Sequence, residues 1–301
     1  MTRTVVLDCD NAFGLLGRDI DDGLALLYLL GTPGIRVAGV TCTFGNTALP
    51  SVIDATQRLL GRVGRGDVPV IAGAARAGDR ATCGAAWLAE TAAARPGTVT
   101  VIATGPLGNV AGAAALDPAF YDNVAEIVCM GGRFRPLTCG WRPLGELNVS
   151  ADPPAARAVL AAPAPVTLVP TEACLPATFR ARDLAALGGL APTVQRAITA
   201  WLVGFGLPRG LDRFMLWDLL PALWAARPRL FRDETVALDA RQPGLGDGLL
   251  APGQGSNVRC LTGLKRPEAV LAALLPAWRR AAPGPARRAL APAALPQPAG
   301  T

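Results

Sequence analysis

The fold is decided by residues 5–46, which contain VVLDCDN at residues 5–11, DIDDGLALLYLL at residues 19–30 and VTCTFGN at residues 40–46. Val5, Val6 and Leu7 form a short apolar run, which predicts a buried strand. Asp8 and Asp10 follow at alternate positions where this strand ends. Further acids then open an apolar segment at residues 23–30, which predicts a helix. A strand, a loop, a helix and a second strand are therefore expected in succession.

Up to five carboxylates gather around this strand-to-helix junction: Asp8, Asp10, Asp19, Asp21 and Asp22. A single aspartate before a helix is usually an N-cap, but capping needs one acid rather than five. Crowded like charges raise one another's pKa, and a bound cation together with the helix dipole relieves the repulsion. The chain contains no histidine and no Cys-x-x-Cys pair. An all-oxygen site for a hard ion, Ca²⁺ or Mg²⁺, is therefore expected.

The composition is that of one sizeable globular domain. The 301 residues are 51% hydrophobic and 17% charged, which is enough to bury a large core. The net charge is +6, but residues 276–301 hold four arginines and no acid, which leaves +2 for the rest of the chain. A nucleic-acid-binding face is therefore not expected. We expect one domain over residues 1–281 and a disordered Pro- and Ala-rich tail over residues 282–301.

The cysteines and the apolar runs indicate the compartment. The seven cysteines are an odd number and are scattered, so reduced thiols in a cytosolic protein are expected. The first predicted strand begins too early for a signal peptide to precede it, and no apolar run reaches the length of a membrane span. The prediction is a cytoplasmic protein with neither a membrane nor a nucleic-acid partner.

Strand-like and helix-like segments alternate along most of the chain. After the first strand, further strands are predicted at residues 36–43, 68–72, 98–103, 126–130 and 166–170, with helices between them and a final helix at residues 267–280. Residues 180–226 are expected to be largely helical, and two weaker strands are expected at residues 236–238 and 257–261. Continuous apolar strands in this rhythm predict an α/β fold with a mostly parallel, open sheet flanked by helices.

Ligands of such sheets bind beyond the carboxyl ends of the strands. Polar or small residues follow the predicted strands at these ends, and all of them should gather on one edge: Asp8, Asp10, Asn46, Thr104, Gly131 and Gly132.

Six motifs in order resemble those of the inosine-uridine-preferring nucleoside hydrolase family. They are DCD with a following DD, VTCTFGN, ATGPLGN (residues 103–109), IVCMGG (residues 127–132), ELNVSADP (residues 146–153) and LWDLLPA (residues 216–222). The resemblance implies a Rossmann-like fold and a Ca²⁺-dependent enzyme that hydrolyses the N-glycosidic bond of a ribonucleoside.

The resemblance also implies a role for each matching residue. The carboxylates of Asp10, Asp22 and Asp218 and the carbonyl of Thr104 would bind one Ca²⁺ ion, and Asp10 would also take the proton from the attacking water. The ribose hydroxyls would be held by Asp21, Asn46, Glu146 and Asn148, while Asp8 would support the cluster from behind. Trp217 departs from the family pattern, but an indole can stack on a base, so we expect it to contact the base. A divalent ion and a neighbouring carboxylate together activate water for attack on a ribosyl cation.

Three departures from the family pattern concern the pocket. Ten residues, NAFGLLGRDI at residues 11–20, separate Asp10 from Asp21, where the family usually has three. Asp19 in this loop competes for the role given to Asp21, and we expect the loop to form a pocket wall within a homodimer or homotetramer. The asparagine that usually precedes the Glu-x-Asn motif is missing, and Trp217 stands where many members have the histidine that protonates the departing base.

Two other functions are compatible with parts of the pattern. A haloacid-dehalogenase-like phosphatase also begins with strand-Asp-x-Asp, but Ala12 stands where that family has Thr or Val, and Lys265 is the only lysine. A catalytically weak or inactive protein that binds nucleosides or ADP-ribose would share the fold. Release of free ribose separates an enzyme from such a binding protein.

Overall fold

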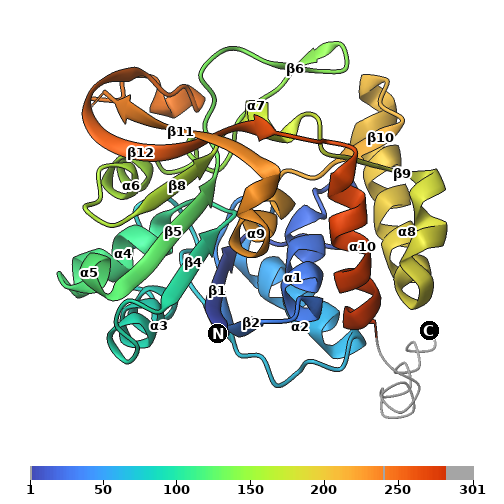
Figure 1. The fold of residues 1–301 in the computed structure, drawn as a ribbon, viewed down its shortest axis with the longest axis horizontal. Helices are drawn as coiled ribbons and strands as arrows, with labels where there is room; N and C mark the ends of the chain where they lie inside the picture. Colours follow the sequence, from blue (N-terminus) through green and yellow to red (C-terminus); the bar gives the residue numbers. More distant parts are fainter. Residues whose placement is uncertain (1, 240, 283–301) are drawn as a thin grey trace, which may run out of the picture.

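The computed structural model describes residues 2–239 and 241–282, so the predicted tail lies, from residue 283 on, outside the described residues. An eight-stranded sheet forms the centre of the domain (Figure 1). Its strands, in spatial order, are β11 (Phe231–Leu238), β12 (Pro252–Leu264), β8 (Val166–Val169), β5 (Val124–Met130), β4 (Val99–Ala103), β1 (Arg3–Cys9), β2 (Ile35–Cys42) and β3 (Val70–Ala72).

All neighbours in this sheet are parallel except β11 and β12, which form an antiparallel pair at one edge. The chain runs from β1 outward to β2 and β3, and then returns to β4 on the other side of β1. The strand order therefore reverses between β1 and β4, which is where open α/β sheets bind their ligands. The predicted single α/β domain with a mostly parallel sheet is confirmed.

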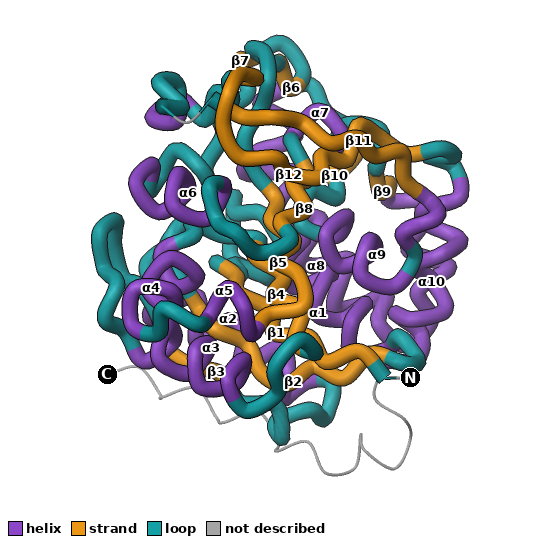
Figure 2. The backbone as a smooth tube through the Cα atoms, turned by 60° about the vertical axis from the view of Figure 1, so that its left-hand side comes forward, coloured by secondary structure: helices purple, strands orange, loops and turns teal. Residues whose placement is uncertain are grey.

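Helices cover both faces of the sheet. One face carries α3 (Cys83–Ala93), α4 (Gly108–Leu116), α5 (Phe120–Asn123) and α6 (Pro153–Leu160), and the other carries α1 (Asp21–Gly31), α2 (Leu49–Arg62), α9 (Leu219–Ala226) and α10 (Ala269–Ala281) (Figures 1 and 2). Side chains of a strand point alternately to the two faces. Accordingly, Val5 and Leu7 of β1 belong to the core under α1, whereas Val6 belongs to the core under α4.

Residues 180–226 are less uniformly helical than the sequence predicts. Besides α8 (Ala191–Trp201) they contain the irregular helical turns η1 (Ala181–Leu190), η2 (Leu202–Gly206) and η3 (Leu207–Arg209). The short strand β10 (Arg213–Met215) pairs with β9 (Thr178–Arg180), which closes the segment on itself. A second small hairpin joins β6 (Thr138–Cys139) to β7 (Arg142–Pro143). Strands this short leave no periodic signal in the sequence.

The remaining elements are α7 (Thr171–Cys174), η4 (Pro228–Leu230) and η5 (Leu245–Asp247). The two late strands, β11 and β12, are longer than predicted, because their outer residues are polar or glycine and are stabilised by the antiparallel ladder rather than by burial. Across the part of the chain that the structure describes, no helix is both long and apolar enough to cross a membrane.

Candidate active site

The carboxyl ends of β1, β2 and β4 meet at the reversal of strand order, and the predicted site residues gather there. Asp8 and Asp10 lie at the end of β1, and Thr104 directly follows β4. The backbone N–H of Thr104 donates to the carbonyl of Asp8 at 2.8 Å, which continues the ladder between the two strands to this edge. Both aspartates are completely buried. The parallel sheet thus brings residues almost a hundred positions apart into contact.

Three carboxylates form the tightest group at the site. Asp21 and Asp22 stand in the first turn of α1, and Asp218 precedes α9. One oxygen of each lies within 4.8 Å of the other two. The N–H of Asp218 donates to Oδ2 of Asp21 at 2.8 Å, although the two residues are 197 positions apart. None of the three side chains caps its helix. The N-cap interpretation of these acids is therefore wrong.

Asp10 lies beside this group and is bound to the loop after β2. Its Oδ2 accepts a hydrogen bond from the backbone N–H of Asn46 at 2.6 Å, and its Oδ1 accepts one from Nδ2 of Asn46 at 3.3 Å. The carboxyl groups of Asp10 and Asp22 are close enough to share a hydrogen bond. A Cβ atom on Gly45 would lie 1.9 Å from Oδ2 of Asp10, so glycine is needed for this close approach.

Thr104 and Asn148 connect the acids to the next strand. The hydroxyl of Thr104 donates to Oδ1 of Asp22 at 2.6 Å. The Thr104 carbonyl accepts from Nδ2 of Asn148 at 3.0 Å, and a carbonyl oxygen has a second lone pair available for another partner. Nδ2 of Asn148 also donates to the carbonyl of Met130 at the end of β5.

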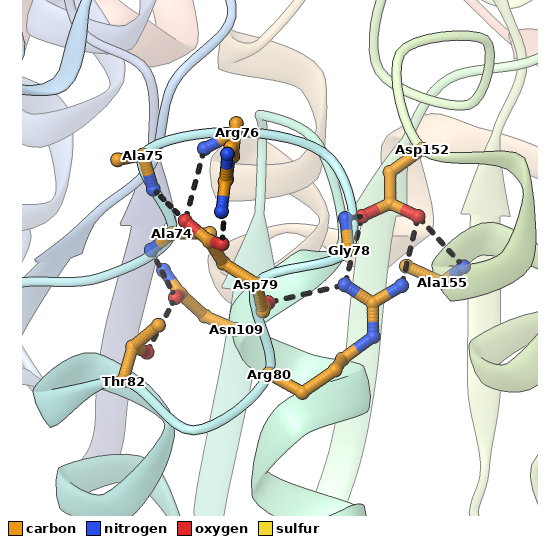
Figure 3. Close-up of polar contacts among 10 residues, drawn as sticks. All are labelled: Ala74, Ala75, Arg76, Gly78, Asp79, Arg80, Thr82, Asn109, Asp152 and Ala155. Carbon is orange, nitrogen blue, oxygen red and sulfur yellow. Dashed lines mark hydrogen bonds and ion pairs between the residues drawn. The ribbon is translucent and has the colours of Figure 1, made fainter.

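Asp8 is held behind the group by neutral donors. Its Oδ1 accepts from the hydroxyl of Thr41 at 2.6 Å and from Nδ2 of Asn109 at 2.8 Å. Oδ1 of Asn109 in turn accepts from the N–H of Ala74 at 2.8 Å and from the hydroxyl of Thr82 at 3.2 Å (Figure 3). Asn109 therefore ties Asp8 to the segment after β3.

Burial is the main electrostatic influence on these acids. Desolvation raises the pKa of Asp8 to about 6, against the opposing effect of its two hydrogen bonds. Burial also raises the pKa of Asp10, Asp21, Asp22 and Asp218. For Asp22 and Asp218 the negative charge of neighbouring carboxylates raises the pKa further. In the absence of a bound cation, these aspartates are therefore harder to ionise in the folded protein than in the unfolded chain.

These residues fit a hard divalent cation. Within the described residues, one buried oxygen of each of Asp8, Asp21, Asp22 and Asp218 has no hydrogen-bond partner. Buried carboxylate oxygens without partners are costly unless they coordinate an ion. Oxygen-only donors are the set that Ca²⁺ and Mg²⁺ prefer. The closest group is formed by Asp21, Asp22 and Asp218, whereas the sequence predicted Asp10 in place of Asp21 as the third carboxylate.

A cavity of about 360 Å³ opens above the acids. Five of the predicted site residues line it: Asn46, Glu146, Asn148, Trp217 and Asp218. Both oxygens of Glu146 already accept backbone N–H groups, from Gly132 at 3.0 Å, Val149 at 2.9 Å and Ser150 at 2.9 Å among others. The Glu146 carboxylate thus fixes the two loops that surround Asn148.

The loop at residues 11–20 contributes Asp19 to the cavity wall. Oδ1 of Asp19 accepts from Nε1 of Trp201 at 2.6 Å, and the N–H of Gly17 donates to the carbonyl of Ala200 at 3.4 Å. Phe13 is buried against Gly23 at the start of α1. The loop therefore packs on α8, while Asp19 does not replace Asp21 in the acid group.

Sequence reasoning missed several residues at this site. Phe205 and Arg209 line the cavity, and Thr41 and Asn109 hold Asp8. Thr41 lies in the VTCTFGN motif and Asn109 in the ATGPLGN motif, so the motifs alone could have indicated that these two residues belong to the site. Phe205 and Arg209 come from the irregular segment between α8 and β10, which carries no motif.

The fold is of the α/β class, and a buried group of carboxylates that fits a divalent cation lies where the strand order of its parallel sheet reverses. The family model described as inosine-uridine preferring nucleoside hydrolase matches residues 5–270, and the chain belongs to this family. The family is metal-dependent, and the chain is an N-glycosyl hydrolase. The strand-Asp-x-Asp pattern therefore belongs to a nucleoside hydrolase and not to a haloacid-dehalogenase-like phosphatase.

Relatives by sequence and by structure agree with this assignment. The chain is 26% identical to a pyrimidine-specific ribonucleoside hydrolase, RihA, of Shewanella woodyi, with 77% of this chain and 81% of the relative covered. It is 32% identical to a probable uridine nucleosidase 2 of Arabidopsis thaliana over 56% of this chain and 58% of that protein. The solved structure of the plant nucleoside hydrolase PpNRh1 shares the fold, with a TM-score of 0.81 at 22% identity over 93% of this chain and 99% of that chain.

Proposed function

We propose that this protein is a Ca²⁺-dependent hydrolase that cleaves ribonucleosides into ribose and free base. The observation that carries the proposal is the buried group of partnerless carboxylate oxygens beside a cavity of about 360 Å³, with Asp218 belonging to both. The names of the relatives, a ribonucleoside hydrolase and a uridine nucleosidase, support the substrate class.

The ion would be held by Asp22, Asp218 and the Thr104 carbonyl, with Asp10 or Asp21 as a further carboxylate. When bound, it would lower the pKa of water and counter the negative charge of the cluster. The observed grouping favours Asp21 as well as Asp22 and Asp218. The choice of Ca²⁺ over Mg²⁺ follows from the family resemblance, and an all-oxygen donor set suits the coordination of Ca²⁺.

The chain's own groups would carry out the remaining steps. A water beside Asp10 transfers its proton to the Asp10 carboxylate while its oxygen bonds to C1′ of the ribose. The hydrogen bonds from Asn46 hold that carboxylate in place for this transfer. The electron pair of the N-glycosidic bond leaves with the base.

Ribose positioning would fall to Asn46 and Asn148, which line the cavity, and to Asp21, which contacts the cavity-lining Asp218. Glu146 would act by fixing the loops around Asn148, since its oxygens are already engaged by backbone N–H groups. Trp217 lines the cavity with an indole that can stack on a base. Positioning of this kind contributes to rate by holding the reacting atoms in a near-attack geometry.

The test is release of free ribose from uridine, cytidine, inosine and guanosine by the purified protein. We expect at least one riboside to be cleaved, activity to be lost in EGTA, which binds Ca²⁺ far more tightly than Mg²⁺, and activity to return on adding Ca²⁺. Full activity after exhaustive chelation would contradict the Ca²⁺ requirement. A metal-loaded protein that releases ribose from none of these substrates would contradict the proposed function.

Two expectations from the sequence stay predictions. Assembly as a homodimer or homotetramer is testable by static light scattering, and a cytoplasmic location is testable by cell fractionation. Leu16, Val203 and Leu207 are 72%, 56% and 62% exposed, which is consistent with burial in an assembly.

A further inference from the structure

The cavity above the acids contains a positive charge that the sequence did not predict. Among the described residues that line the cavity, Arg209 is the single cation, and it faces a site otherwise rich in carboxylates, including Asp19, Glu146 and Asp218. Arg209 ends η3, in the irregular segment between α8 and β10. The Arg209 guanidinium lines the cavity but does not belong to the cluster of aspartates, so the proposed metal site does not account for it.

Arg209 is held in place by Phe205, and its positive charge partly offsets the rise in the pKa of Asp19 that burial causes. Its guanidinium carbon lies 3.6 Å from the centre of the Phe205 ring, and its Nη1 donates to the Phe205 carbonyl at 3.2 Å. No ion pair joins it to any residue of the described ranges. The hairpin between β6 and β7 supports it from behind, since a Cβ on Gly140 would lie 1.8 Å from the Arg209 carbonyl. The charge therefore remains available to a ligand in the cavity.

The reaction creates a need for such a charge. When the N-glycosidic bond breaks, its electron pair passes to a ring nitrogen of the base, which becomes anionic unless it is protonated. The chain has no histidine, and the Trp217 indole is not a useful acid near neutral pH. The carboxylates around the cavity would repel a developing anion. Arg209 is the cavity-lining group with the opposite charge, and the flat ring of Phe205 beside it can contact a base.

We propose that Arg209 stabilises the negative charge that develops on the base as it departs. The inference rests on the proposed function. The guanidinium stays protonated throughout and donates hydrogen bonds to the base, which takes up a proton from solvent after the bond has broken. The proton released by the attacking water goes to Asp10, so the two halves of the reaction are served by different residues.

The experiment compares ribosides whose leaving groups differ in basicity. We would measure kcat/KM for uridine, inosine and p-nitrophenyl riboside in the wild-type enzyme and in Arg209→Gln and Arg209→Lys. Arg209→Gln should lower kcat/KM for uridine or inosine about 10²-fold, as expected for the loss of one charge-stabilising donor. The loss for p-nitrophenyl riboside should stay below about threefold, because p-nitrophenolate is already a stable anion. Arg209→Lys keeps the charge and should recover part of the loss.

Two controls separate this role from a structural one. Arg213→Gln removes an exposed arginine of β10 that pairs with Asp212, and it should leave all three rates unchanged. Calorimetric titration with Ca²⁺ should give the same affinity for Arg209→Gln and the wild type if the acid group is intact.

The experiment distinguishes an error in the role of Arg209 from an error in the proposed function. Equal losses for all three ribosides in Arg209→Gln, or no loss for any of them, would overturn the role of Arg209 while leaving the hydrolase intact. A wild-type enzyme that cleaves neither the natural nor the activated riboside would overturn the proposed function itself. A loss that grows with the basicity of the leaving group supports the inference.

Discussion

The Asp10 carboxylate accepts two hydrogen bonds from one neighbour, Asn46. It also lies beside the carboxyl group of Asp22. Its carboxylate is completely buried, so bulk solvent does not compete for these contacts. An acid in this environment is both held in a fixed orientation and made more basic than usual, because burial raises its pKa. These are the properties that a general base requires.

Asp10→Asn should therefore remove turnover while the protein still folds. The amide keeps the volume and can still accept the N–H of Asn46, but it cannot take a proton. We expect kcat for the best riboside to fall at least about 10²-fold, with an unchanged circular dichroism spectrum. Asp54→Asn, at an exposed acid of α2, is the control and should keep the wild-type rate. Retention of more than about a tenth of the rate in Asp10→Asn would show that another group is the base.

Helix α6 is fastened to the segment after β3 by one ion pair. Asp152 caps α6, since its side chain accepts from the N–H of Ala155. The same carboxylate accepts from Nη1 and Nη2 of Arg80, at 2.8 Å each, and from the N–H of Gly78 at 3.0 Å (Figure 3). The segment that holds Asn109, and through it Asp8, is thereby anchored.

Arg80→Met should destabilise the protein, because the Asp152 carboxylate is only 1% exposed and would lose its bidentate ion pair with Arg80. We expect the free energy of unfolding to fall by about 2 kcal/mol, below the range for fully buried pairs because Arg80 is partly exposed. Urea denaturation measures the change. Arg76→Met breaks a comparable but solvent-exposed pair with Asp79 and should change the free energy of unfolding much less than Arg80→Met does. Equal effects of the two substitutions would refute the anchoring role of Arg80.

The acid group also shapes the stability of the whole domain. Burial raises the pKa of Asp8 to about 6 and that of Asp10 to about 7, whereas an unfolded aspartate titrates near 3.9. Between about pH 4 and pH 7 the folded state consequently binds more protons than the unfolded state, and the stability of the metal-free protein falls as the pH rises. A bound divalent cation needs the deprotonated carboxylates, so it should offset this loss.

The midpoint of thermal unfolding, followed by calorimetry, tests this linkage. In EDTA the midpoint should fall as the pH rises from about 5 to about 8, and added Ca²⁺ should raise it by more at pH 8 than at pH 5. Asp21→Asn removes one of the crowded acids and should make the slope in EDTA shallower. A midpoint that rises with pH in EDTA, or a Ca²⁺ effect that is independent of pH, would contradict the linkage.

The fold class and most of the clustered aspartates could be predicted from the residues alone. Apolar strands such as VVL and VTVIA are buried on both faces, and this property is visible in the residues without any tertiary information. The position of Asp8, Asp10 and Thr104 at one edge follows from the parallel arrangement alone, because all carboxyl ends of such strands point the same way. The order of the motifs supplied the remaining residues through the family resemblance.

Which side chains meet around the site depends on how distant elements pack together. The approach of Asp218 to Asp21 depends on how α9 is set against α1, and no local pattern encodes a contact between residues 197 positions apart. The placement of Arg209 over Phe205 depends on an irregular turn without periodicity. The partners of Glu146 were unpredictable for the same reason: how two loops fold together sets which backbone N–H groups reach its oxygens, whereas a sequence motif identifies the residue alone.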